Sequence, residues 1–145
     1  MLINRRKIQI EWGDCDPGGI VYFPRYLEYC DACTLALFAR AGLPKRHMLK
    51  KYRIAGIPMV EAHAQFFQPA EYPDIIEVIS TIAEWGRSSF KVQHRIYNNK
   101  IQAAEVIEKR VWVKRLPGQR SRFKGQPIPQ EVKSRLSGNS TPRAR

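Results

Sequence analysis

Two carboxylates flank a cysteine in the stretch GDCDPGGIVYFPRY, which runs from Gly13 to Tyr26. The Pro-Gly-Gly after Asp16 is typical of a turn, and an ordinary turn is the simplest explanation of the motif. Residues 20–23 are, however, too apolar for an exposed loop. They lead to Pro24, a typical first residue of a helix, where the nearest unpaired N–H belongs to Phe23. A carboxylate beside such an amide suits acyl chemistry, because the amide stabilises an oxyanion while the carboxylate attacks or activates water.

Other reactive residue types form no comparable group. Cys15 has no histidine in its own segment to deprotonate it, so we interpret it as a packed thiol. Cys30 and Cys33 have CxxC spacing, but they fall inside the predicted helix without a second ligand pair. The three histidines are scattered along the chain, at His47, His63 and His94. The sequence therefore predicts neither a metal site nor a bound cofactor.

A predicted hairpin supplies a second candidate site. Arg87, Ser88, Ser89 and Lys91 follow Trp85-Gly86, and a cation with hydroxyls can bind a phosphate. A solvated turn is the alternative explanation. Neither a P-loop nor a GxGxxG motif occurs, so the sequence gives no sign of nucleotide triphosphate or dinucleotide chemistry.

One amphipathic helix is predicted from Pro24 to about Ala41, ended by Gly42-Leu43-Pro44. Apolar residues that recur at the spacing of a helical turn form a stripe along this helix, which includes Leu27. Asp31 falls within that stripe, where an unpaired carboxylate would be costly, so we expect it to have a partner or a function.

Period-two alternation predicts five strands, one before the helix and four after it, at residues 3–12, 56–69, 74–85, 88–97 and 101–116. Short breaks at 86–88 and 98–100 suit antiparallel hairpins. Residues 45–53 are expected to be a polar link, and a short helix is possible in 127–136. The class is α+β, with strands wrapped around one helix. Because one helix cannot cover both faces of such a sheet, we expect self-association.

The chain has 145 residues and a net charge of +12, which fits one domain. Residues 114–145 carry nine Lys or Arg and one Glu, so most of the excess charge lies in this segment. It lacks interleaved aromatic residues and known nucleic-acid motifs, so we do not expect nucleic acid as the main partner. We find no signal peptide or membrane helix, and three cysteines suit a reduced cytoplasmic setting.

The motif GDCDPGGIVYFPRY, the helix beginning YLEYCDA and the hairpin WGRSSF together resemble the 4-hydroxybenzoyl-CoA thioesterase branch of the hot dog fold acyl-CoA thioesterases. The likeness extends from Ile8 to about Leu116. It implies a hot dog domain over 1–116, with a five-stranded antiparallel sheet around one long central helix. The basic extension over 117–145 is outside the likeness, and partial disorder is one of the expectations for it.

The resemblance also implies roles for individual residues. Asp16 would be the nucleophile or the base for water, and the Phe23 amide would polarise the thioester carbonyl. Tyr22 would lie beside the acyl pocket, and Asp31 near the far end of the acyl group. Arg87, with Ser88 and Lys91, would face the CoA phosphates.

The implied reaction is hydrolysis of a compact, aromatic acyl-CoA to the acid and free CoA, with CoA as part of the substrate and no separate cofactor. Active sites would lie at the interface of a dimer or tetramer. A short-chain aliphatic acyl-CoA is an alternative substrate. A non-catalytic hot dog module that binds acyl-CoA or a partner protein is an alternative function.

Overall fold

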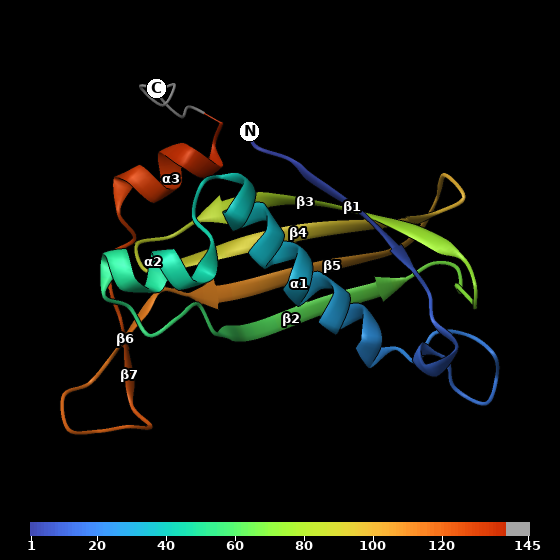
Figure 1. Cartoon of the computed structure of the whole chain (residues 1–145), viewed down its shortest axis with the longest axis horizontal. Helices are drawn as coiled ribbons and strands as arrows, with labels where there is room; N and C mark the ends of the chain where they lie inside the picture. The colour runs from blue at the N-terminus through green and yellow to red at the C-terminus, as the bar shows by residue number, and fades with distance from the viewer. Residues whose placement is uncertain (139–145) are drawn as a thin grey trace.

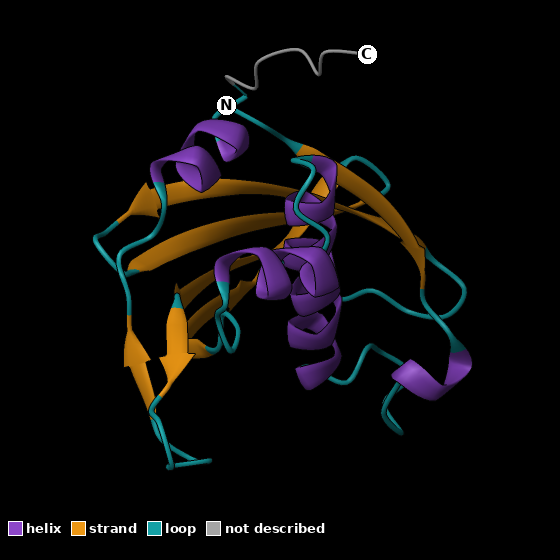
Figure 2. Ribbon diagram, turned by 60° about the vertical axis from the view of Figure 1, so that its left-hand side comes forward, coloured by secondary structure: helices purple, strands orange, loops and turns teal. Residues whose placement is uncertain are grey.

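A computed structural model describes residues 1–138 of the chain. A five-stranded antiparallel sheet curves around a central helix, α1 (Figures 1 and 2). This confirms the predicted sheet and its wrapping of the helix. The elements in chain order are β1 (Asn4–Gln9), the 3-10 turn η1 (Trp12–Asp14), α1 (Pro24–Arg40), α2 (Lys45–Tyr52), β2 (Met59–Phe66), β3 (Ile75–Trp85), β4 (Ser89–Asn98), β5 (Ile101–Val111), β6 (Val113–Arg115), β7 (Phe123–Gly125) and α3 (Gln130–Leu136).

The strand order in the sheet is β1-β3-β4-β5-β2, so β1 and β2 form its edges. Both predicted hairpins are present: β3 pairs with β4 and β4 pairs with β5, each antiparallel. Asn99 and Lys100, at the second turn, have φ values of 52° and 66°, as a tight hairpin turn requires. The alternation of buried and half-buried residues along β3 and β4 gives the sheet one face against the helix.

Helix α1 begins at Pro24 as predicted and ends at Arg40, one residue before the predicted end. Gly42 follows with a φ of 79°, a backbone conformation that favours glycine after a helix. The buried face comprises Tyr26, Cys30, Cys33, Thr34, Leu37 and Phe38. Asp31 lies beside this face rather than within it, so its predicted place inside the buried stripe is wrong.

The prediction of a single helix is also wrong, because α2 occupies the segment predicted as a polar link. Its residues are mostly basic, but Met48 is fully buried and Leu49 and Tyr52 pack against the same core. The helix ends at Arg53, whose φ of 52° is left-handed. One apolar face, at the spacing of a helical turn, therefore holds this short helix against the sheet.

The described part of the basic segment after Leu116 folds back onto the sheet. β7 pairs with β6, and the short helix expected in 127–136 is α3. Val132 and Leu136 are buried in the same cluster as Phe38 and Trp112. Regular secondary structure therefore continues past residue 116. Residues 139–145 of the predicted extension lie outside the described residues.

Candidate active site

The loop between β1 and α1 forms a tight turn that holds Asp16. The Asp16 N–H donates to the Ile20 carbonyl over 3.0 Å, and the Gly19 N–H donates to the Asp16 carbonyl over 2.9 Å. Gly19 has a φ of 84°, in the region that favours glycine. A Cβ at Gly18 would lie 3.0 Å from Asp16 Oδ1, closer than ordinary van der Waals contact. The two glycines therefore have separate functions: Gly19 permits the turn, and Gly18 leaves space for the carboxylate.

The Asp16 carboxylate is half-buried, and one of its oxygens is anchored. The Gly18 N–H donates to Oδ1 over 2.7 Å. Within residues 1–138, no hydrogen bond or ion pair reaches Oδ2. An anchored carboxylate with one oxygen available can attack a carbonyl or accept a proton from water.

Asp14 has a different environment from Asp16. Its Oδ2 accepts a hydrogen bond from the Glu11 N–H over 2.9 Å, and Oδ1 lies 3.7 Å from Arg25 Nε. The Asp14 carbonyl accepts from the Tyr22 N–H over 2.8 Å. Asp14 therefore connects η1 to the start of α1 and has a structural role in the loop.

The start of α1 leaves one backbone donor available. The Arg25 N–H donates to the Tyr22 carbonyl over 2.9 Å, and the Tyr26 N–H donates to the Phe23 carbonyl over 3.1 Å. Pro24 has no N–H. The Phe23 N–H has no acceptor within the described residues, and it lies at the positive end of the helix dipole. It can donate to a carbonyl oxygen on which negative charge develops.

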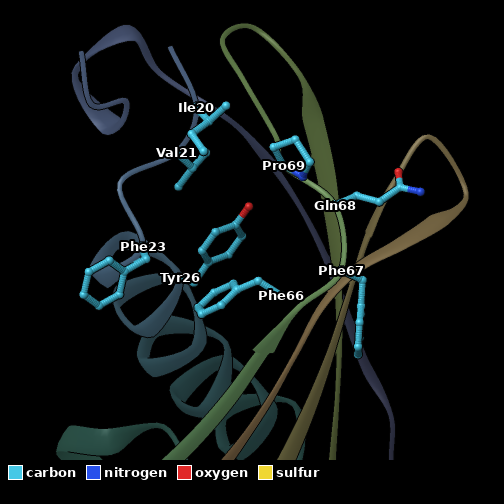
Figure 3. A pocket seen from close by; sticks show the side chains of 8 residues that line it. All are labelled: Ile20, Val21, Phe23, Tyr26, Phe66, Phe67, Gln68 and Pro69. Carbon is cyan, nitrogen blue, oxygen red and sulfur yellow. The ribbon is translucent and has the colours of Figure 1, made fainter. Parts of the chain in front are cut away.

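A cavity of about 330 Å³ opens beside this helix start (Figure 3). Figure 3 shows the Tyr26 and Phe66 rings next to each other between α1 and β2, with centroids 5.4 Å apart. The wall is mostly apolar and aromatic: Ile20, Val21, Phe23, Tyr26, Phe66, Phe67, Gln68 and Pro69. Such a wall suits a flat apolar group, and Phe23 places the unpaired amide at its edge.

Tyr22 does not line this cavity in the single chain. Its side chain is half exposed, and its ring centroid lies 5.6 Å from that of Phe23. The structure therefore places Tyr22 next to the cavity residue Phe23.

Asp31 lines a second cavity, of about 360 Å³, further along α1. Arg110 Nη2 donates to Asp31 Oδ1 over 2.7 Å. The Asp31 side chain is 56% exposed, whereas that of Arg110 is only 5% exposed. The partner that the sequence required for Asp31 is thus Arg110, on β5, which the sequence did not identify.

The hairpin residues Arg87, Ser88 and Lys91 lie at the opposite end of the sheet from the Asp16 loop (Figure 1). Arg87 is exposed, Ser88 is half-buried, and Lys91 pairs with Glu84 over 3.4 Å. One chain therefore gathers Asp16, Tyr22 and Phe23 at one end and leaves the candidate phosphate-binding residues at the other.

A buried polar group in the core was not predicted from the sequence. His94, Glu108 and Arg110 occupy inward positions of β4 and β5. Ser80 Oγ lies 2.7 Å from His94 Nδ1, and His94 Nε2 lies 3.1 Å from Glu108 Oε1. This resembles a Ser-His-Glu hydrolase triad, but all three side chains are fully buried, so a substrate cannot reach the serine. The sequence did contain a signal for this group. These polar residues occupy the same alternating strand positions as the apolar residues that face the core.

The cysteines are free thiols, and two of them are unsuited to redox chemistry. Burial raises the pKa of Cys30, and it raises the pKa of Cys33 to about 11. Thiols that resist ionisation are poor nucleophiles. Among residues 1–138, no three His, Cys, Asp or Glu side chains form a possible metal site. No helix in this range is long and apolar enough to cross a membrane.

The curved antiparallel sheet, the helix that it encloses and the loop carboxylate define an α+β protein of the hot dog class. Residues 10–136 match the family model of the thioesterase-like superfamily, and the chain belongs to that family.

Two relatives are similar in sequence. The chain is 40% identical over 89 residues to 4-hydroxybenzoyl-CoA thioesterase from Pseudomonas sp. (strain CBS-3), in an alignment covering 61% of this chain and 63% of that protein. This alignment thus spans less than two thirds of that relative. The chain is 29% identical over 128 residues to 1,4-dihydroxy-2-naphthoyl-CoA hydrolase from Microcystis aeruginosa (strain NIES-843 / IAM M-2473), with 88% of each protein covered.

A solved structure extends the likeness over nearly the whole chain. The crystal structure of a 4-hydroxybenzoyl CoA thioesterase mutant complexed with 4-hydroxybenzoyl CoA superposes with a TM-score of 0.87 and 28% identity. The superposition covers 94% of this chain and 99% of that one.

Proposed function

We propose that this protein is an acyl-CoA thioesterase that hydrolyses a compact, aromatic acyl-CoA of the 4-hydroxybenzoyl-CoA type. The observation that carries the proposal is that the loop holding the half-buried carboxylate Asp16 leads directly to the unpaired Phe23 amide, which lies beside an apolar cavity. The names of the relatives, which are thioester hydrolases for aromatic acyl groups, support the same reaction and substrate class.

In the proposed reaction, the thioester carbonyl oxygen accepts a hydrogen bond from the Phe23 N–H. Asp16 then either attacks the carbonyl carbon, giving an acyl–enzyme anhydride that water hydrolyses, or removes a proton from an attacking water. Both routes release CoA as the thiol and the acyl group as its acid. Stabilisation of the oxyanion at a helix N-terminus supports either route, because the dipole and the amide act where negative charge develops.

The cavity beside Phe23 supports an aromatic acyl group over a long aliphatic one. Its aromatic wall and volume of about 330 Å³ suit a single ring or a small fused ring system. A short-chain aliphatic acyl group would also fit, and comparison of the two classes of substrate is part of the test below. We assign CoA to the substrate and propose no separate cofactor.

The exposed edge of the sheet supports self-association. β2 pairs with β5 on one side only, and its side chains are mostly exposed. If two copies related by a two-fold axis paired through β2, the strands would run antiparallel, so Met59 of one copy would lie near Phe66 of the other. Phe66 lines the cavity beside Phe23, whereas Met59 lines the cavity that contains Asp31.

Such a dimer would bring together the residues that one chain separates. Asp16 and Phe23 of one copy would meet Asp31 of the second, with Arg87, Ser88 and Lys91 of the second copy at the same end as its Asp31 cavity (Figure 1). The cationic residues would then be available to CoA phosphates. We propose a dimer, alone or within a tetramer, as the active form in a reduced cytoplasmic setting.

The experiment is a panel of acyl-CoA thioesters, benzoyl, 4-hydroxybenzoyl, 1,4-dihydroxy-2-naphthoyl, acetyl and hexanoyl, assayed by release of free thiol. Aromatic thioesters should be hydrolysed with the highest kcat/KM. Asp16→Asn should lower kcat by about 10²- to 10⁴-fold, the usual range for a general base or nucleophile. Asp14→Asn is the matched control, since it changes a carboxylate in the same loop that has structural contacts only.

Absence of turnover with every thioester would contradict thioester hydrolysis and favour a binding module. Turnover that is intact in Asp16→Asn would contradict the proposed mechanism. A clear preference for acetyl or hexanoyl thioesters would replace the aromatic substrate by the aliphatic alternative.

A further inference from the structure

The exposed side of α2 has a dense group of positive charges. Its apolar residues, such as Met48, pack against the core, and every lysine and arginine of the helix is exposed. No acidic residue occurs in residues 45–53. Within residues 1–138, Lys51 alone among these cations forms an ion pair, with Glu131 over 3.0 Å. The cations of this segment without an ion-pair partner are Lys45, Arg46, Lys50 and Arg53.

The β6–β7 hairpin is a second basic element. Residues 113–125 contain five Lys or Arg and no acidic residue. All five of these side chains are exposed, and none forms an ion pair within the described part of the chain. Lys114 lies directly opposite Lys124 in the strand pairing, and like charges in this position destabilise a hairpin. A charge arrangement that works against local stability is expected where the charge serves binding.

The two basic elements adjoin at one end of the molecule (Figure 1). The chain that leaves α2 pairs with β6, because the Ala55 N–H donates to the Val113 carbonyl over 2.8 Å and the Val113 N–H donates to the Gly56 carbonyl over 3.2 Å. Lys45 of α2 and Phe123 of β7 line the same cavity of about 360 Å³. The exposed cations of residues 45–53 and 113–125 together form one surface, the basic face.

The basic face lies beside the residues proposed to meet the CoA phosphates. The Trp112 N–H donates to the Ser88 carbonyl over 2.7 Å, and the Ile128 N–H donates to the Arg87 carbonyl over 2.9 Å. CoA brings about four negative charges, in a diphosphate and a terminal phosphate. Within residues 1–138, the basic face has nine cations without an ion-pair partner, four in residues 45–53 and five in residues 113–125. CoA alone therefore leaves much of this positive charge unmatched.

We propose that the basic face binds the acidic surface of a carrier protein, and that the enzyme hydrolyses acyl thioesters attached to such a protein through a phosphopantetheine arm as well as acyl-CoA. This inference rests on the proposed thioesterase function and extends it to a second class of substrate. The arm is the same in both substrates, and an acidic protein surface takes the place of the adenosine and its phosphate. A larger anionic partner matches a larger basic surface.

The reaction itself is unchanged by the carrier. Water supplies the oxygen of the new carboxylic acid, directly or through the acyl–enzyme anhydride, and the C–S bond breaks. The sulfur takes a proton and remains on the arm of the carrier protein as a free thiol. No oxidant, reductant or further co-reactant is needed.

A nucleic acid is the other anionic macromolecule that a basic surface can contact, and the structure favours it less. Phe123 is the single aromatic residue in the hairpin, and the Arg115 guanidinium lies over its ring, 5.2 Å from the centroid. Tyr52 of α2 is half-buried against Trp112 and bonded to Glu131. The basic face therefore lacks the free aromatic rings on which single-stranded bases stack.

The test compares three thioesters of one acyl group by release of free thiol: 4-hydroxybenzoyl-pantetheine, 4-hydroxybenzoyl-CoA and an acidic acyl carrier protein loaded with 4-hydroxybenzoyl-phosphopantetheine. At low salt, kcat/KM for the carrier-protein thioester should exceed that for the uncharged pantetheine thioester by about 10-fold or more, because opposite charges speed encounter. Raising the ionic strength from about 0.05 to 0.3 M should remove most of this advantage and leave the pantetheine thioester unaffected.

Arg46→Gln/Lys50→Gln removes two charges from the middle of α2, where neither residue lines a cavity near the candidate site. It should lower kcat/KM for the carrier-protein thioester by about 10-fold, through KM, and change kcat/KM for 4-hydroxybenzoyl-CoA by less than about 2-fold. Lys7→Gln/Lys100→Gln is the matched control, since it removes two exposed cations at the opposite end of the sheet. This control should behave as the wild type with all three thioesters.

Equal kcat/KM for the carrier-protein and pantetheine thioesters would overturn the proposal, as would equal losses in the α2 variant and its control. If the α2 variant instead lost affinity for a single-stranded RNA without any change in carrier-protein turnover, the basic face would be a nucleic-acid surface and the proposal would be wrong. Failure of the thioesterase function itself would appear differently, as absence of turnover with all three thioesters.

Discussion

The rings of Tyr26 and Phe66 pack with their centroids 5.4 Å apart, and this contact joins the first turn of α1 to the exposed edge strand β2. Both rings line the cavity beside Phe23, so the helix that supplies the amide and the strand that forms the sheet edge share one wall (Figure 3). The shape of this cavity thus depends on the edge of the sheet.

Phe66→Ala should widen the cavity and shift substrate preference toward larger acyl groups. The ratio of kcat/KM for 1,4-dihydroxy-2-naphthoyl-CoA to that for benzoyl-CoA should rise by about 10-fold, because pocket volume discriminates apolar groups at about this level. Ile101→Ala, at a half-exposed side chain at the start of β5 that lines neither this cavity nor that of Asp31, is the control. An unchanged ratio in Phe66→Ala would show that the acyl group binds elsewhere.

Gly18→Ala and Gly19→Ala should separate catalysis from folding. The added Cβ at Gly18 would press on Asp16 Oδ1, so kcat should fall by about 10-fold with little change in Tm. At Gly19, nothing lies near the added Cβ, but the φ of 84° is strained for alanine, which should cost about 1–2 kcal/mol of stability. Steady-state kinetics and thermal unfolding measure the two effects. Similar kinetic losses in both variants would contradict the separate functions of these glycines.

Glu108 should make stability depend on pH in the acid range. Its pKa is about 2 in the folded protein, below the ordinary value of 4.5, so the folded state favours the ionised form. This contribution, about 3 kcal/mol, is fully present above pH 4.5 and is lost as pH falls toward 2. Unfolding by urea at pH 6 and at pH 3 should therefore show a smaller pH dependence in Glu108→Gln than in the wild type.

Glu131 provides the control for that measurement. Hydrogen bonds from Tyr52 and Lys51 lower the pKa of Glu131 too, but Glu131 lies on the surface, where solvent screens these interactions and their contribution to stability is small. Glu131→Gln should retain most of the pH dependence of the wild type. If Glu108→Gln retained it equally, the buried network would not be the source of the acid sensitivity.

Mixed dimers should test whether two copies share one site. When Asp16→Asn and Asp31→Asn proteins are unfolded together and refolded, about half of the dimers should contain one chain of each kind. If Asp31 serves the Asp16 of its partner, each mixed dimer has one site with both native carboxylates. Turnover with the native preference for 4-hydroxybenzoyl-CoA should then reappear. A mixture that shows only the preference of Asp31→Asn would contradict a shared site.

Much of the fold follows from local patterns. The alternation of Ile76, Val78 and Ile82 with polar residues predicts an inward face for β3, and Pro24 and Gly42 delimit α1. These signals depend on neighbours in the sequence. α2 was missed because its basic residues hide a narrow apolar face around Met48.

The candidate site also combines relations that are local in the sequence with relations that are not. Asp16 and Phe23 lie in one short segment, so their relation could be read from helix-start chemistry. The pairing of Asp31 with Arg110 joins residues 79 positions apart, and no local pattern specifies which polar residue on β5 lies beneath the helix. The roles of Tyr22, Arg87, Ser88 and Lys91 stay predictions, because they depend on how a second copy is placed.

The C-terminal helix has a consequence for how the basic segment can be studied. Val132 and Leu136 are buried in the core cluster that contains Phe38 and Trp112, and the Leu2 N–H donates to the Leu136 carbonyl over 3.2 Å. Deleting residues 117–145 would therefore open the core and release the start of the chain together with the charge. Charge-reversal variants on the exposed β6–β7 hairpin leave α3 in place. They therefore measure what the positive charge contributes without opening the core.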